Sequence, residues 1–221
     1  MDQRHEITWR DGQVPISVQF DDPFYSLDDG LAETRHVFLG GNDLPARFFP
    51  GFHIAELGFG TGLNLIAAAL EWQASGQDGP LRYTSFEAFP LAPDTARAAL
   101  LAFPEAAPFA YAIAEGLAGD GWIRTETLEA RVIFGDARQT VPEWDGHADA
   151  WFLDGFSPAK NPELWEPDLL KAVGAHTAPG GTCATYSAAG AVRRALGAAG
   201  FRVDRVPGYG RKRHMIRGTR T

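Results

Sequence analysis

Residues 53–64 read HIAELGFGTGLN and join a short apolar strand to the start of a helix. The strand is followed by glycines at positions 58, 60 and 62. Glycine lacks Cβ, so it can adopt positive φ, form a tight turn and let a ligand lie against the bare backbone. Dinucleotide-binding loops read G-x-G-x-x-G, but Leu63 stands where the third glycine of that pattern belongs. The stretch therefore predicts a nucleoside-binding loop of another kind.

The carboxylate Glu56 at the strand end completes the pattern E-x-G-x-G-x-G. This spacing suits S-adenosylmethionine, which carries no phosphate. The helix that opens after Gly62 would then face the methionine carboxylate or the adenosine of that cofactor. The alternative is a glycine-rich turn after an ordinary buried strand.

Strand and helix patterns alternate from residue 53 onward. We expect strands at 53–57, 82–87, 131–134, 149–153, 181–186, 201–206 and 213–217, with helices at 63–75, 93–103, 107–118, 162–176 and 188–199. Such alternation gives a mostly parallel sheet covered by helices on both faces. The last two strands are too close for a crossover helix and should form an antiparallel hairpin. The sequence thus predicts an α/β, Rossmann-like methyltransferase fold with a seven-stranded sheet.

The N-terminal residues show a different pattern. Residues 7–20 contain two extended runs around Asp11-Gly12, which is a hairpin signal. Apolar residues then recur at helical spacing, with Asp28 or Asp29 as the cap and Gly40-Gly41 as the stop. We expect this hairpin and helix to lie outside the central sheet.

The composition is that of a single soluble domain, because 221 residues with 45% hydrophobic residues can bury one core. We divide residues 1–221 into an extension, 1–50, and a Rossmann-like core, 51–221. The single cysteine, Cys183, allows no intrachain disulfide. Signal-peptide and membrane-span patterns are missing, and the histidines lack metal-ligand spacing. We expect a cytoplasmic protein with no membrane contact and no metal.

Charge is unevenly distributed along the chain. The net charge is −8, yet residues 193–221 hold nine Lys or Arg against the single acid Asp204. A basic end on an acidic protein fits docking of a particular RNA better than coating of any nucleic acid. The alternative is a solvated basic end that only maintains solubility.

Carboxylates close four of the expected parallel strands, where doubly wound sheets bind their ligands. Glu87 is spaced to accept hydrogen bonds from ribose hydroxyls, although it could instead cap a helix. Asp136 could receive the adenine amino group, with the Ala137 amide on a ring nitrogen, or could cap the next short helix.

The stretch FLDGFSPAKNPELW at 152–165 predicts a rigid loop that holds the methyl acceptor. It brings Asp154 close in sequence to Phe156, Lys160 and Trp165. Methyl transfer needs an uncharged nucleophile, so Asp154 could attract an amine and accept its proton while an aromatic face stacks on a base. The alternative is that Asp154 only orders the loop and the aromatic residues pack in the core.

Five segments together resemble the methyltransferase module of the bacterial MnmC family. They are GLAETRHVFLGGN (30–42), AELGFGTGLN (55–64), SFEAFPL (85–91), FLDGFSPAKNPELW (152–165) and GYGRKRHM (208–215). The resemblance implies methylation, from S-adenosylmethionine, of the aminomethyl group on a tRNA wobble uridine, giving 5-methylaminomethyl-(2-thio)uridine. It implies tRNA, through its anticodon region, as the partner and other modification enzymes acting upstream. Larger members continue into an FAD-dependent oxidase module, so we expect a stand-alone form without FAD.

The resemblance also assigns roles to residues, with the N-terminal segment folded over the cofactor and Asp154 next to the reacting amine. The cofactor-binding residues are expected to be Tyr25, Ser26, Glu33, Glu56, Gly58, Gly60, Gly62, Asn64, Glu87, Asp136, Ala137 and Asp154. The substrate and tRNA contacts are expected from Phe156, Lys160, Trp165, Arg211, Lys212 and Arg213. Two alternatives remain: a methyltransferase of a small-molecule or protein amine, and a non-catalytic tRNA-binding protein.

Overall fold

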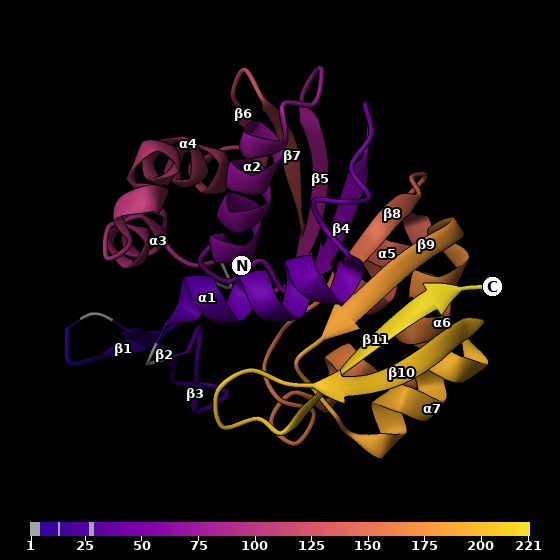
Figure 1. Cartoon of the computed structure of the whole chain (residues 1–221). Coiled ribbons are helices and arrows are strands. Elements are labelled where there is room, and N and C mark those ends of the chain that lie inside the picture. Colours follow the sequence, from indigo (N-terminus) through magenta and orange to yellow (C-terminus); the bar gives the residue numbers. More distant parts are fainter. Residues whose placement is uncertain (1–4, 13, 27–28) are drawn as a thin grey trace.

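The computed structural model describes residues 5–12, 14–26 and 29–221. Its centre is an eight-stranded sheet in the order β10-β11-β9-β8-β4-β5-β7-β6 (Figure 1). The parallel strands are β4 (His53–Leu57), β5 (Leu81–Glu87), β7 (Leu128–Phe134), β8 (Ala148–Leu153) and β9 (Thr177–Thr185). The hairpin strands β10 (Phe201–Pro207) and β11 (His214–Arg220) pair antiparallel, and β11 joins β9. The predicted parallel sheet and terminal hairpin are confirmed.

Helices cover both faces of this sheet because neighbouring strand residues alternate between two apolar clusters. One face packs against α2 (Leu63–Ser75) and α4 (Ala107–Ala118), with α3 (Pro93–Leu100) packed on α4, and the other against α5 (Ala137–Glu143), α6 (Pro167–Ala175) and α7 (Gly190–Ala198) (Figure 1). In β8, Phe152 belongs to the first cluster and Trp151 to the second. Burial on both faces explains why consecutive residues of β8, Trp151, Phe152 and Leu153, are all apolar.

The strand count differs from the prediction of seven. Strand β6 (Trp122–Arg124) pairs antiparallel with β7 at the edge of the sheet. Three residues carry too little pattern to be recognised as a strand, and only the neighbouring strand supplies their partners. Another departure is the helix expected over 162–176, which Pro167 divides into a 3₁₀ turn (Pro162–Trp165) and α6.

The N-terminal hairpin forms outside the central sheet, as expected. Strands β1 (Ile7–Arg10), β2 (Val14–Ser17) and β3 (Asp22–Pro23) make a separate antiparallel sheet. Asp11 and Gly12 take positive φ values of 51° and 68° at the turn between β1 and β2. None of the helices in the described ranges is long and apolar enough to cross a membrane.

The helix after this sheet runs further than predicted. Helix α1 (Gly30–Thr34) is capped by Asp29, whose side chain accepts a hydrogen bond from the Ala32 amide, whereas Asp28 lies outside the described residues. The run continues through a π turn (Arg35–Leu39) and a 3₁₀ turn (Gly40–Asn42), so the two glycines do not stop it. Gly41 is needed there for close packing, because a Cβ would lie 2.6 Å from Cβ of Ala184 in β9.

This packing makes opposite predictions for the two neighbouring glycines. Gly41→Ala should lower the free energy of unfolding by about 2 kcal/mol, because the new methyl group overlaps side chains in β9 and β11. Gly40→Ala is the matched control and should raise it by up to about 1 kcal/mol, since Gly40 is exposed with helical backbone angles and the nearest atom to its Cβ is the Arg35 carbonyl oxygen at 3.4 Å. Urea denaturation measures both, and equal effects would contradict this packing.

Candidate active site

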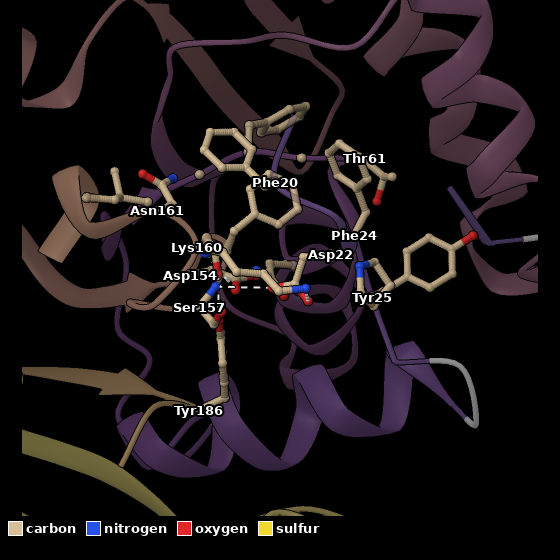
Figure 2. A pocket seen from close by; sticks show the side chains of 18 of the residues that line it. Phe20, Asp22, Phe24, Tyr25, Thr61, Asp154, Ser157, Lys160, Asn161 and Tyr186 are labelled. Carbon is tan, nitrogen blue, oxygen red and sulfur yellow. Dashed lines mark hydrogen bonds and ion pairs between the residues drawn. The ribbon is translucent and has the colours of Figure 1, made fainter. Parts of the chain in front are cut away.

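A cavity of about 980 Å³ opens where the parallel strands end. Its walls come from the loops after β4, β5, β7, β8 and β9, and from the N-terminal segment that lies across them (Figure 2). Ligands of doubly wound sheets bind at this edge. The cavity therefore lies where the sequence placed the site.

The glycine loop turns sharply beneath this cavity. Gly58, Gly60 and Gly62 have φ values of 81°, 55° and 86°, a region that favours glycine. Gly58 and Gly60 line the cavity. Gly62 does not line it and caps α2 instead, where an added Cβ would lie 2.9 Å from the Phe59 ring. Two of the three glycines thus present bare backbone to a ligand.

The side chain of Asn64, in the first turn of α2, holds two carboxylates at once. Its Nδ2 donates to Oε1 of Glu56 at 2.8 Å and to Oδ2 of Asp154 at 2.7 Å. Its Oδ1 accepts a hydrogen bond from the Thr34 hydroxyl at 2.8 Å. One amide therefore joins α1, α2 and the ends of β4 and β8.

The two carboxylates have different surroundings. Glu56 is fully buried below the cavity wall, and Ser85 donates to its second oxygen at 2.7 Å. Burial raises the pKa of Glu56 well above its usual range, and the bonds from Asn64 and Ser85 oppose this shift. Asp154 lines the cavity, where burial raises its pKa to about 6 against the hydrogen bonds from Gly155 and Asn64. Asp154 is thus placed to exchange a proton with a ligand near neutral pH.

Glu87 and Asp136 both line the cavity, at the ends of β5 and β7. Glu87 accepts backbone hydrogen bonds from Gly60 at 3.0 Å and Phe89 at 2.8 Å, which fix its carboxylate beside the glycine loop. Asp136 accepts the Arg138 amide as the N-cap of α5 and pairs with the Arg138 guanidinium at 2.7 Å. The capping alternative holds for Asp136, and its adenine contact, with that of Ala137, stays a prediction.

The loop after β8 is tied to the N-terminal segment. The Ser157 amide donates to Oδ2 of Asp22 at 3.2 Å, and Lys160 bonds the Asp21 carbonyl oxygen and lies 3.5 Å from Oδ1 of Asp22 (Figure 2). Phe156 stacks on Phe20, with ring centroids 4.7 Å apart. Lys160 therefore lines the cavity with its ammonium group already bound to Asp21 and Asp22 of the N-terminal segment.

Trp165 does not line the cavity, contrary to its expected place in the acceptor pocket. Its side chain is buried, and the indole nitrogen donates to the Phe156 carbonyl oxygen at 2.9 Å. The ring also meets Tyr186 edge-on, with centroids 6.4 Å apart. Trp165 thus stabilises the loop after β8 through this buried hydrogen bond and does not contribute to the cavity surface.

Three residues of the basic tail were expected to contact the substrate or tRNA, and two of them line the cavity. Arg211 and Lys212 line the cavity, but Arg213 is exposed outside it. Lys212 pairs with Glu33 at 2.8 Å. Tyr25 and Ser26 also line the cavity, on the N-terminal side.

Several lining residues were not predicted. Phe20, Asp22 and Phe24 come from the N-terminal segment, where the sequence shows a hairpin signal but no pattern that marks these three as ligand-binding residues. Tyr186 follows β9 directly, so the strand-end rule extended to the fifth parallel strand would have found it. Thr34 gave no signal because its partner, Asn64, is 30 residues away.

Comparisons with known proteins show which proteins the whole chain is similar to. A family model described as S-adenosyl-L-methionine-dependent methyltransferase matches residues 112–221. The protein named tRNA 5-methylaminomethyl-2-thiouridine biosynthesis bifunctional protein MnmC from Caulobacter sp. (strain K31) is 45% identical over 95% of this chain. The protein of the same name from Chromobacterium violaceum is 41% identical over 96% of the chain. The chain spans only 37% and 34% of the length of these two relatives.

A solved structure has the same fold. The crystal structure of MNMC2 from Aquifex aeolicus superposes with a TM-score of 0.76 and 29% identity, over 97% of this chain and 70% of that one. The similarity therefore includes the N-terminal segment as well as the central sheet.

The shared amide makes a prediction about stability. Asn64→Leu should lower the free energy of unfolding by about 3 kcal/mol, because both carboxylates lose a buried donor. Thr34→Val removes only the hydroxyl that bonds Asn64 and should cost about 1 kcal/mol. Urea denaturation near neutral pH measures both variants. A loss for Asn64→Leu no greater than that for Thr34→Val would show that the amide does not hold the carboxylates.

Proposed function

The chain belongs to the S-adenosyl-L-methionine-dependent methyltransferases and is related over nearly its whole length to MnmC proteins, so we propose that it methylates a tRNA wobble uridine. The acceptor would be the amine of 5-aminomethyl-(2-thio)uridine and the product 5-methylaminomethyl-(2-thio)uridine. The product nucleoside, 5-methylaminomethyl-2-thiouridine, appears in the names of the relatives. The single observation that carries the proposal is the Asp154 carboxylate, held by Asn64 inside the cavity beside the glycine loop.

The residues of the loop fit the cofactor. Gly58 and Gly60 keep the positive φ values that bring the loop backbone to the cavity, and Gly58 also lets the loop pack closely on the end of β8, since a Cβ there would lie 3.2 Å from the Asp154 carbonyl oxygen. Glu87 presents a fixed carboxylate for the ribose hydroxyls at the adjacent strand end. When bound, S-adenosylmethionine supplies an electrophilic methyl group. Tyr25, Ser26 and Glu33 would close over it from the N-terminal side.

For this reaction the protein must hold a neutral amine in line with that methyl group. An amine enters as its ammonium form, which has no lone pair, and Asp154 attracts this cation. Asp154 then accepts a proton directly or through water, and the amine nitrogen becomes nucleophilic. The Phe156 ring offers an aromatic face for the uracil. Asn64 keeps the Asp154 carboxylate in place throughout.

The tRNA itself would meet the basic end of the chain. Arg211 and Lys212 stand at the rim of the cavity, and Arg213 lies exposed beside them. Such residues position a phosphate backbone without reading its sequence. The substrate amine must come from a reaction that installs a primary aminomethyl group on the uridine. We place this activity in the cytoplasm, where tRNA is modified.

The reaction can be tested directly with tRNA that carries 5-aminomethyluridine at the wobble position. Incubation with the protein and S-adenosylmethionine should add one methyl group to this nucleoside, which nucleoside mass analysis detects. Asp154→Asn keeps the size of the side chain but removes the base, so we expect turnover to fall about 100-fold or more.

The control for this variant is S-adenosylhomocysteine binding, which should be retained if Asp154 serves the acceptor. A protein that binds the cofactor but adds no methyl group to this tRNA would contradict the proposal, and small-molecule and protein amines would then be the substrates to assay.

Activity should also depend on pH through Asp154. Its pKa is raised to about 6, so the carboxylate form is present above that pH and lost below it. We expect kcat/KM to fall about tenfold per pH unit below pH 6. A profile that stays flat between about pH 5 and pH 8, with cofactor binding unchanged, would show that Asp154 is not the base.

A further inference from the structure

One ammonium group already lies in the cavity wall, and it belongs to the protein. Nζ of Lys212 is 2.8 Å from Oε1 of Glu33 and 4.0 Å from the centre of the Tyr186 ring. All three residues line the cavity. A carboxylate together with an aromatic face is the arrangement that proteins use to bind ammonium groups.

The aromatic ring that receives this ammonium is held in place by other contacts, and the carboxylate lies on a helix. The Tyr186 hydroxyl donates to the Gly155 carbonyl oxygen at 2.7 Å, and the ring meets Trp165 edge-on. Glu33 lies in α1, and its side chain is only 15% exposed. Lys212, in contrast, lies between β10 and β11 with its side chain 46% exposed. The ring is thus fixed by contacts other than Lys212, the carboxylate is largely covered on its helix, and Lys212 is the most exposed of the three residues.

This site adjoins the reacting carboxylate. Tyr186 bonds the backbone of Gly155, the residue after Asp154. Burial raises the pKa of Asp154, while the charge of Lys212 lowers it and the charge of Glu33 raises it. Both charges of the subsite therefore act on the Asp154 carboxylate, which lines the same cavity.

We propose that Glu33 and Tyr186 form a binding subsite for a primary ammonium group, which Lys212 fills in this structure and leaves when the ammonium of a ligand enters. The inference rests on the proposed function, which brings two such groups to the cavity. One is the aminomethyl group of the acceptor and the other is the α-ammonium of the methionine part of the cofactor. Both share the chemistry that the subsite recognises.

Displacement of Lys212 would have a second effect. Lys212 stands between Arg211 and Arg213, so its freed side chain would join a continuous basic run at the rim. That run could then contact a phosphate. Entry of the small amine would therefore strengthen the contact with the rest of the tRNA.

The experiment measures binding without turnover. Lys212→Met keeps an unbranched apolar stem and removes the competing ammonium. Calorimetric titration with 5-aminomethyluridine alone and with S-adenosylmethionine alone distinguishes the two sources. The ligand that uses the subsite should bind about fivefold more tightly to the variant, the gain expected if Lys212 leaves the site free about one fifth of the time. The matched ligands without the ammonium, 5-hydroxymethyluridine and 5′-methylthioadenosine, should show no gain.

Further variants separate the subsite from a general charge effect. Tyr186→Leu removes the aromatic face without changing any charge, so in the Lys212→Met background it should abolish most of the gain. Arg202→Met removes a cation from an exposed position in β10 and should change the affinity for neither 5-aminomethyluridine nor S-adenosylmethionine. Circular dichroism checks that each variant is folded.

The inference is overturned if Lys212→Met leaves both affinities unchanged or weakens both, or if the gain persists after Tyr186→Leu is added. These titrations do not require methyl transfer, so a protein that passes them but leaves tRNA unmodified would contradict the proposed function alone.

Discussion

Two carboxylates at the ends of adjacent strands, β4 and β8, share the single carboxamide of Asn64. Like charges this close in a water-poor site repel, and each needs a donor to offset its lost hydration. The amide offers one N–H to each, while Thr34 fixes the amide from the other side. The start of α2, the end of α1 and the edge of the sheet that faces the cavity are therefore positioned by one group. Glu56 gives the amide its orientation, and Asp154 is the carboxylate that this orientation presents to the cavity.

The opposite wall is built from contacts between distant parts of the chain. Asp22, in the small N-terminal sheet, binds both the backbone and Lys160 of the loop after β8. Phe20 and Phe24 pack around Phe156 in the same region. Polar contacts fix the loop edge while aromatic contacts exclude water beneath it. The cavity thus has a rigid floor made by the strand ends and a cover made by the N-terminal segment.

The features that the sequence predicted correctly are those whose residues lie close together along the chain. The glycine loop, the strand-end carboxylates and the hairpin at Asp11-Gly12 are short patterns whose chemistry lies within a few residues, and these were recognised. Lys212 was assigned to tRNA from the basic composition of the tail, but its partner Glu33 is 179 residues away. The edge strand β6 and the cavity-lining Phe20 and Phe24 were missed for the same reason. Position within a motif is local information, whereas the choice of partner is decided by packing.

The contact between Asp22 and Ser157 joins residues 135 positions apart in sequence. A contact of such separation closes a very long loop, so it can form only after the chain between them is in place. The central strand β4 likewise can pair with β8, its neighbour in the sheet, only after β8 has been synthesised. During synthesis the N-terminal sheet would be the first segment made and among the last to dock. Phe20 and Phe24, which flank β3 and later line the cavity, therefore stay exposed on the nascent chain until this sheet docks.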